Sequence, residues 1–423
     1  MAGDTISFRA LKGTHDLLPP ESWRWQRAVR LAMDSFALAG YAPVETPMLE
    51  LTEVFERGVG ASSEVVGKQM YTFTDRGGRS LTLRPEGTAP VMRAVLEHGL
   101  HRGPLPIKLA YGGAMFRQER PQKGRYRQFF QVGIESIGSN DAAVDAEVIE
   151  VGKRYLADAG VETVLVLNSI GHVDPSCRQG YLKVLVEFLS ERAAALAPED
   201  RARIATNPLR TFDSKEPRTI ETMQEAPLIS DHLCAGCAEH FEAVRTHLDD
   251  LGIEYRFEPR LVRGLDYYTR TAFEYISVGL GAQNAVGGGG RYDGLSEVLG
   301  GPPLAAIGFA LGIDRILIAE EEGPGSGAPR ARVDVYIVSL GEAAGREALR
   351  LATLLRRRGV AADFGLGGRG MKGQMKDADR SGARRALILG EAEIEARTAT
   401  VKDLATGEQH SVAFVDIETS WTP

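Results

Sequence analysis

A short strand with one polar face most limits what this chain can fold into. Residues 129–135 read Phe-Phe-Gln-Val-Gly-Ile-Glu, and successive side chains of a strand point to opposite faces of a sheet. One face is apolar and can enter a core: Phe130, Val132 and Ile134. The other carries an aromatic ring, an amide, a glycine and a carboxylate: Phe129, Gln131, Gly133 and Glu135. Because that second set makes a poor core, we predict a sheet whose free face is the floor of a ligand site, with the glycine leaving room in the middle.

A dense cationic loop, residues 116–127, lies just upstream of this strand. Arg117 is predicted at a strand end, and Arg125 and Arg127 follow a glycine. A planar guanidinium can hold a phosphate with two hydrogen bonds. A solvated charged hairpin is the alternative, but the polar face behind the loop favours a site. The strand's length of about 20 Å fits a nucleotide beside a small polar molecule, so we predict chemistry on a triphosphate.

Composition limits the class of protein. The 423 residues suggest two or three domains, and no stretch approaches the run of about 20 apolar residues that a membrane span needs. The N-terminus lacks a secretory pattern. Three cysteines are too few for a disulfide scaffold, so we expect a cytoplasmic protein. The net charge of −7 argues against nonspecific nucleic-acid coating, although local basic patches can still bind nucleic acid.

The residue composition and the pattern of expected strands and helices change along the chain, and these changes predict its domains. An acidic, glycine- and proline-rich stretch at 321–330 is the linker. Residues 331–423 alternate strands with helices, which indicates a small α/β domain with a largely parallel sheet. Residues 1–170 and 259–320 hold strands without regular helical crossovers, typical of an antiparallel α+β sheet, and 171–258 reads as a helical insertion.

Periodicity places the principal elements of the first domain. Helices are expected at 22–39, 181–196 and 232–251. Strands are expected at 71–75, 80–83, 107–116, 127–137, 272–278 and 283–287.

Two further segments combine turn-forming residues with polar side chains that can bind a ligand. In Arg-Pro-Glu-Gly-Thr, residues 84–88, Glu86 and Thr88 flank a turn at Gly87. Thr88 can act as a helix cap and also face a ligand. Residues 261–269 place an arginine, a carboxylate and two phenols together, which favours a ligand-facing loop over a core strand.

Small residues mark two more segments. The four glycines at 287–290 permit close approach of a ligand or another backbone, but no Gly-Lys-Ser/Thr follows, as a P-loop requires. Residues 307–316 lead into a helix that has Arg315 near its start and aims it into the cleft.

Cys234 and Cys237, with His232 and His240 nearby, are candidate ligands of a metal site. These residues all fit on one helix, and no second Cys-x-x-Cys exists. Ordinary thiols are therefore favoured, and no metal bound by a protein cluster is expected.

Together, these motifs resemble those of histidyl-tRNA synthetases, which are class II aminoacyl-tRNA synthetases, from residues 12–19 to 400–403. Residues 41–50, with Pro47, look like class II motif 1, which implies a homodimer interface. Residues 111–135 look like motif 2, and 308–315 like motif 3, although Asp314 stands where the family often has glutamate. The segments at 261–268 and 287–295 resemble the two histidine-specific motifs.

The resemblance implies a role for each matching residue. Around ATP, Arg117 would bind the α-phosphate, Glu119 the adenine amine and Phe129 the purine ring, while Arg125 and Arg315 would hold the outer phosphates. Around histidine, the implied set holds the amino group or the imidazole: Glu86, Gly87, Thr88, Gln131, Glu135, Tyr267 and Tyr268. Arg263 would act with Arg117 in catalysis, beside the attacking carboxylate and the α-phosphate.

The family implies a class II antiparallel-sheet catalytic domain with a helical insertion, followed by an α/β anticodon-binding domain. The implied reaction joins L-histidine to ATP, with Mg²⁺, and then transfers histidine to the 3′ end of tRNA-His. Arg369, Lys372 and Lys376 are the expected tRNA contacts, with a solvated helix face as their alternative.

Two other functions remain open at this point. Some paralogues of the family are histidine-sensing regulatory subunits of ATP phosphoribosyltransferase, but these typically lack the anticodon domain and parts of the catalytic motifs. Another class II synthetase, for proline or threonine, is disfavoured by Glu135 together with residues 263–268.

Overall fold

The computed structural model describes residues 8–60, 63, 65–172, 177–277, 285–322, 333–366 and 368–422. The chain divides into two compact units: Trp25–Ser326 with Met1–Asp16, and Gly327–Pro423 with Leu17–Arg24. The predicted linker falls almost wholly outside the described residues. In the part of the chain that is described, no helix has both the length and the apolar character needed to cross a membrane.

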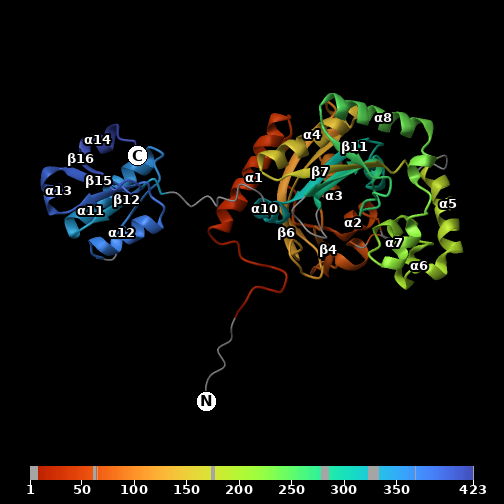
Figure 1. Ribbon diagram of the computed structural model, residues 1–423, viewed down its shortest axis with the longest axis horizontal. Helices are drawn as coiled ribbons and strands as arrows, with labels where there is room; N and C mark the ends of the chain where they lie inside the picture. Colours follow the sequence, from red (N-terminus) through yellow and green to blue (C-terminus); the bar gives the residue numbers. More distant parts are fainter. Residues whose placement is uncertain are drawn as a thin grey trace, which may run out of the picture. The chain divides into compact units, whose positions relative to one another are not determined.

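The first unit is built on a sheet that contains eight of the described strands, in the order β1-β5-β6-β11-β10-β9-β7-β8. Figure 1 labels β6, β7 and β11 of this sheet. The six central strands pair antiparallel, and the edge strands β1 and β8 pair parallel to their neighbours. The predicted antiparallel α+β sheet is therefore confirmed. The bounds are β1 (Ala42–Pro43), β5 (Ile107–Phe116), β6 (Gln128–Ile137), β11 (Ala306–Gly312), β10 (Ala285–Arg291), β9 (Thr269–Ser277), β7 (Thr163–Ser169) and β8 (Tyr255–Phe257).

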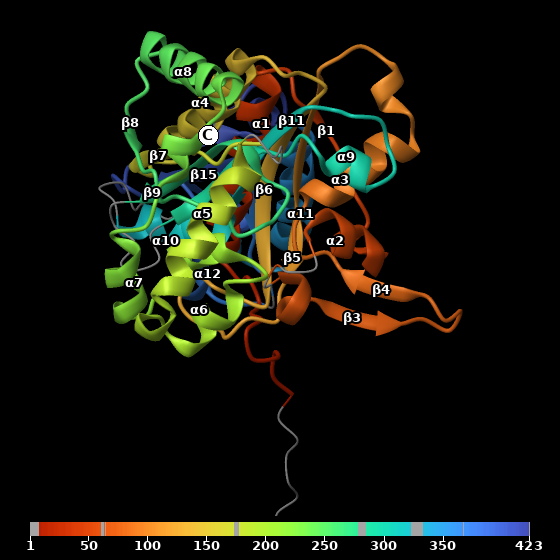
Figure 2. The ribbon, with the colours of Figure 1, turned by 90° about the vertical axis from the view of Figure 1, so that its right-hand side faces the viewer.

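One face of this sheet is covered by helices. The apolar side chains of β6, Val132 and Ile134, are fully buried there together with Phe36 of α1 (Glu21–Leu38). Helices α4 (Ala142–Asp158) and α8 (Ala235–Asp250) run side by side on this face (Figures 1 and 2). The opposite face of β6 is thereby left free to line a site, as the alternation of its side chains predicts.

The segment between β7 and β9 contributes a separate helical group. It comprises α5 (Arg178–Glu191), α6 (Pro198–Arg203) and α7 (Pro217–Met223), packed around buried Tyr181, Leu185 and Leu189. Helix α8, which the sequence placed in the same insertion, packs instead on α4, and β8 joins the main sheet. The segment thus leaves the sheet after β7 and returns to it at α8.

A smaller antiparallel sheet, β2-β4-β3, lies next to the main one. It consists of β2 (Leu49–Leu51), β4 (Ser80–Leu83) and β3 (Tyr71–Thr74), and Figure 2 shows β3 and β4 as a projecting hairpin. Helices α2 (Thr52–Gly58), α3 (Thr88–Glu97), α9 (Leu295–Val298) and α10 (Ile313–Glu322) complete the first unit's α-helices among the described residues.

The second unit has a sheet in the order β13-β12-β14-β15-β16. It was predicted to be largely parallel, but only β13, β12 and β14 pair parallel, while β15 and β16 are antiparallel. The segment that connects β15 to β16 is too short for the crossover that a parallel pair of strands requires. The bounds are β12 (Val335–Ser339), α11 (Glu342–Arg357), β13 (Ala362–Phe364), α12 (Met371–Arg380), β14 (Arg385–Leu389), α13 (Glu391–Ala396), β15 (Thr398–Asp403), β16 (Gln409–Ala413) and α14 (Phe414–Thr419).

Candidate active site

A cavity of about 360 Å³ lies in the first unit, lined from β6, β9, β10 and β11 and from the segments before α3 and β9. Its size is that of a small-molecule site. Every residue predicted to bind ATP or histidine lines it, except Glu135: Glu86, Gly87, Thr88, Arg117, Glu119, Arg125, Phe129, Gln131, Arg263, Tyr267, Tyr268 and Arg315. Residues separated by more than two hundred positions therefore meet in one place.

At one end of the cavity, Arg117 lies against an aromatic ring. Its Nε donates to the Pro85 carbonyl at 2.9 Å, and its guanidinium carbon is 5.2 Å from the centre of the Phe129 ring. Glu119 lies 3.8 Å from Arg117 and 3.5 Å from Arg125. Two guanidinium groups thus share one carboxylate, which leaves positive charge available to an anion beside a flat ring.

Arg315 joins this cationic end from the first turn of α10. Its Nε donates to the Gly124 carbonyl at 3.0 Å and its Nη1 to the Ala285 carbonyl at 2.6 Å. Burial lowers the pKa of Arg315, and the nearby positive charge of Arg125 lowers it further. Guanidinium groups that repel one another in this way are stabilised when a polyanion binds between them.

Arg263 lies at a different part of the cavity wall. Its guanidinium forms an ion pair with Glu274 and lies 5.4 Å from the centre of the Tyr268 ring. Its buried Nε has no hydrogen-bond partner among the described residues. A Cβ atom on Gly288 would lie 3.0 Å from Nη1, so a glycine there gives the guanidinium its space. Arg263 therefore offers a donor that a ligand can use.

Glu135 lies beneath the lining of the cavity rather than in it, and its side chain is fully buried. Its carboxyl group accepts hydrogen bonds from the Thr88 hydroxyl at 2.7 Å and from the Tyr292 hydroxyl at 2.5 Å. Burial raises the pKa of Glu135 to about 8. A Cβ atom on Gly308 would lie 1.8 Å from the carboxyl oxygen, so this glycine is required for the carboxyl group to fit.

The expectation that Gly133 leaves room for a ligand is wrong. A Cβ atom there would lie 2.6 Å from the Tyr111 ring and 2.5 Å from the Phe309 carbonyl. The ring of Tyr111, from the neighbouring strand β5, occupies that space, because Tyr111 pairs directly with Gly133 in the register of the sheet. The glycine thus admits a tyrosine of the protein itself.

Two polar groups complete the floor. The buried Oε1 of Gln131 has no partner among the described residues, so it can accept a hydrogen bond from a ligand. Glu86 accepts from the backbone N–H groups of Thr88 at 2.7 Å and Ala89 at 3.0 Å, and burial raises the pKa of Glu86. Glu86 therefore caps α3 by accepting hydrogen bonds from the N–H groups of its first turn. Thr88 was expected to cap this helix, but its hydroxyl donates to Glu135 instead.

Three lining residues that bear on the chemistry are not among those predicted from the sequence: Tyr111, Arg210 and Glu274. Glu274 had a visible signal, because it is a carboxylate between the aromatic residues Phe273 and Tyr275 of a strand. Arg210 comes from the helical group between β7 and β9, and its reach to the cavity depends on tertiary packing that no local pattern encodes.

The raised pKa of Glu135 predicts a pH-dependent stability. Between the ordinary value of 4.5 and the folded value of about 8, the folded protein keeps a proton that the unfolded chain has released. This group's contribution to stability therefore falls as pH rises through that range and is constant above it. We expect the thermal midpoint of the native protein to decline from about pH 5 to about pH 9 relative to that of Glu135→Gln, which cannot titrate. A difference that stays constant over this range would contradict the assignment.

Comparison with known proteins gives consistent matches over both units. A family profile described as "Histidyl-tRNA synthetase" matches residues 13–316, and one described as "Anticodon binding domain" matches residues 334–420. The chain is similar to a "Histidine--tRNA ligase" from Saccharopolyspora erythraea, with 52% identity over 97% of each chain, and to one from Nocardia farcinica, with 51% identity over 98% and 97%. The fold is similar to the crystal structure of apo S. aureus histidyl-tRNA synthetase, with a TM-score of 0.82 and 37% identity over 97% and 99% of the two chains.

Proposed function

The chain belongs to the histidyl-tRNA synthetase family, and we propose that it activates L-histidine with ATP to histidyl-adenylate and pyrophosphate and then transfers histidine to the 3′ end of tRNA-His. The family resemblance found in the sequence is confirmed by these matches. The observation that carries the detailed reaction is the single cavity that joins Phe129 and Arg117 to Arg263 and Gln131.

The first step must bring two anions together, the carboxylate of histidine and the α-phosphate of ATP. Arg117 and Arg263 line the same cavity, so both can neutralise charge around the reacting atoms. No general base is needed, because the attacking carboxylate is already ionised, and catalysis consists of alignment and charge stabilisation.

The family also implies Mg²⁺, and the lining of the cavity fits it. Magnesium in such sites is held by one or two carboxylates and by the substrate's phosphates, and Glu119 and Glu274 are carboxylates on the wall. The ion would supply further neutralisation of the triphosphate. Arg117, Arg125 and Arg315 do the same from the protein's side.

Histidine recognition is assigned to the floor beside α3. The unpartnered Gln131 Oε1 and the Glu86 carboxylate are acceptors suited to an ammonium group. Glu135, held by Thr88 and Tyr292, is the acceptor that we assign to an imidazole N–H, reached by a shift of the Thr88 or Tyr292 hydroxyl. An amino acid without that N–H would form no such hydrogen bond, and Glu135 would keep those from Thr88 and Tyr292.

The second unit is the part that we expect to hold the tRNA anticodon. Lys372 and Lys376 are exposed one turn apart on α12, and Arg369 just before this helix is exposed and paired with Asp377 at 2.7 Å. Basic groups on one helix face suit phosphate contacts, and the matched anticodon-binding family supports this role.

The regulatory-subunit alternative is not favoured. Such paralogues typically lack an anticodon-binding domain, whereas this chain matches one over residues 334–420. The aromatic and cationic groups expected for ATP also meet in the cavity. Histidine-dependent exchange of pyrophosphate into ATP, followed by charging of tRNA-His, is the direct test. A purified protein that binds histidine but supports no such exchange would favour the regulatory role.

We place the protein in the cytoplasm, where tRNA charging serves translation. Its three cysteines form no disulfide among the described residues. Reduced thiols agree with that compartment.

A homodimer is also proposed, formed through the motif 1 region and the small sheet beside it. Leu51 of β2 and Phe73 of β3 both pair with Leu81 of β4 and are 48% and 45% exposed. Met48 and Leu49 are also about half exposed. A cluster of exposed apolar side chains of this kind marks an interaction surface, and a second copy of the chain is the partner that the family implies.

Replacing Phe73 by glutamate is expected to convert the dimer to a monomer. The change puts a charge into an apolar contact but leaves the monomer's core untouched, since the side chain is exposed. Light scattering after size-exclusion chromatography measures the mass. Leu349→Glu, at a 52% exposed position on α11, is the control and should remain dimeric. A native protein that is monomeric at micromolar concentration would contradict the proposal.

A further inference from the structure

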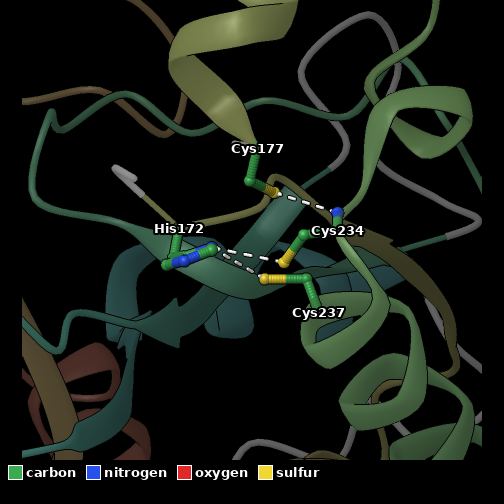
Figure 3. A group of neighbouring side chains, drawn as sticks. All are labelled: His172, Cys177, Cys234 and Cys237. Carbon is green, nitrogen blue, oxygen red and sulfur yellow. Dashed lines mark hydrogen bonds between the residues drawn. The ribbon is translucent and has the colours of Figure 1, made fainter. Parts of the chain in front are cut away.

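Four metal-ligating side chains that the proposed reaction does not use lie together at the base of the helical group between β7 and β9 (Figure 3). They are His172, which follows β7, Cys177 at the start of α5, and Cys234 and Cys237 at the start of α8. Their ligand atoms all lie within 4.8 Å of one another. Cys177 and Cys237 are buried, and His172 and Cys234 are partly buried.

The expectation of no metal-binding protein cluster has a premise that the structure does not support. It rested on Cys234, Cys237, His232 and His240 lying on one helix. In the structure, the ring of His232 packs on Tyr181, and His240 lies 3.4 Å from Asp145. The ligands that join the Cys-x-x-Cys pair are His172 and Cys177, about sixty residues earlier, which only the fold brings near.

We propose that these four residues form a structural zinc site. Three thiolates and one imidazole are a known zinc set, and both pairs, His-x₄-Cys and Cys-x₂-Cys, have short spacings typical of such sites. Four protein ligands close the coordination sphere, which is the mark of a structural rather than a catalytic site. Soft sulfur donors favour zinc over magnesium or calcium.

The distances fit a tetrahedral ion. Zinc–sulfur and zinc–nitrogen bond lengths require about 3.8 Å between two sulfurs and about 3.6 Å between sulfur and nitrogen. The Nδ1 of His172 is 3.1 Å from the Cys237 sulfur and 3.8 Å from the Cys234 sulfur, and Figure 3 shows both sulfurs directed at this ring. The widest ligand pair, at no more than 4.8 Å, has to close by about 1 Å.

Two of the three sulfurs lie at helix N-termini. The backbone N–H of Cys234 donates to the Cys177 sulfur at 3.5 Å, and Cys177 and Cys234 are the N-terminal caps of α5 and α8. Helix N-termini stabilise negative charge. When zinc binds, each of the three thiols releases its proton to solvent. Gly171, with φ of +63°, leaves the room that Cys177 needs, because a Cβ atom there would lie 2.8 Å from the sulfur.

The site would join the two ends of the inserted helical group. His172 and Cys177 lie where the chain leaves the main sheet, and Cys234 and Cys237 lie where it returns. Arg210, which lies between them in sequence, lines the active-site cavity. The zinc ion therefore fixes the base of the segment that delivers Arg210.

The test is the zinc content of the untagged full-length protein, purified without chelator and measured by plasma mass spectrometry. We expect one zinc per chain in the native protein and in His232→Ala, the neighbouring histidine that is no ligand. We expect a loss to near zero in His172→Ala and Cys237→Ser. Retention of full zinc by His172→Ala would overturn the site.

A second measurement uses only the native protein, so it does not depend on whether a variant folds. Titrating the native protein's thiols with a mercurial should release zinc in step with the modification of three cysteines, and Co²⁺ exchanged into the protein should give the charge-transfer and d–d bands of a tetrahedral thiolate site. A native protein that takes up neither ion, or that carries a Cys234–Cys237 disulfide in a non-reduced peptide map, would overturn the proposal. Neither assay depends on ligase activity, so its outcome is independent of the proposed function.

Discussion

Replacing Arg263 by histidine is expected to reduce histidine-dependent pyrophosphate exchange by about 10²–10³, the typical cost of removing one preorganised donor to transition-state charge. Arg263 has a buried Nε with no partner among the described residues, and it lines the cavity that also contains Arg117. An imidazole is shorter and cannot reach the same position with two donors. The loss should fall on the rate of adenylation.

The control for this variant is Arg256→His, at an exposed position on β8 outside the cavity. It makes the same chemical change and should retain native exchange. Both variants should keep the native circular dichroism spectrum. An Arg263→His protein that is folded and still exchanges pyrophosphate at the native rate would remove Arg263 from the mechanism.

Replacing Glu135 by alanine is expected to raise the KM for histidine by about 10-fold, equivalent to about 1.4 kcal/mol for one lost hydrogen bond, with little change in the KM for ATP. Glu135 is fully buried between Thr88 and Tyr292, and it lies at the opposite end of β6 from Phe129. The effect should therefore be confined to the amino acid. Steady-state exchange at varied histidine and at varied ATP measures it.

The reciprocal control is Glu119→Ala. Glu119 lies beside Arg117 and Arg125 at the cationic end of the cavity, so its loss should raise the KM for ATP and leave the KM for histidine nearly unchanged. Equal changes in both constants for Glu135→Ala would show that this residue supports the cavity as a whole and does not recognise the imidazole.

Much of the fold could be predicted from the local periodicity of apolar residues in the sequence. The predicted strands at 80–83 and 107–116 match β4 and β5, and the predicted strand at 127–137 differs from β6 by one residue. These segments are long or bounded by turn residues, and their side chains alternate clearly. The floor of the site followed from the same alternation, because two-residue periodicity puts Phe129 and Gln131 on one face.

Features that depend on which strands become neighbours could not be predicted in this way. Tyr111 occupies the space above Gly133 only because β5 pairs with β6 in one register. His172 joins Cys237 only because the end of β7 and the start of α8 lie at the same place.

The central claim is that histidine and ATP lie end to end over β6, with their negative charges neutralised by arginines. A crystal structure of the protein with both substrates tests it most directly. The account predicts adenine stacked on Phe129, the α-phosphate within hydrogen-bond distance of Arg117 and Arg263, and the imidazole directed at Glu135. Adenine bound away from Phe129, or a histidine side chain that points away from Glu135, would contradict it.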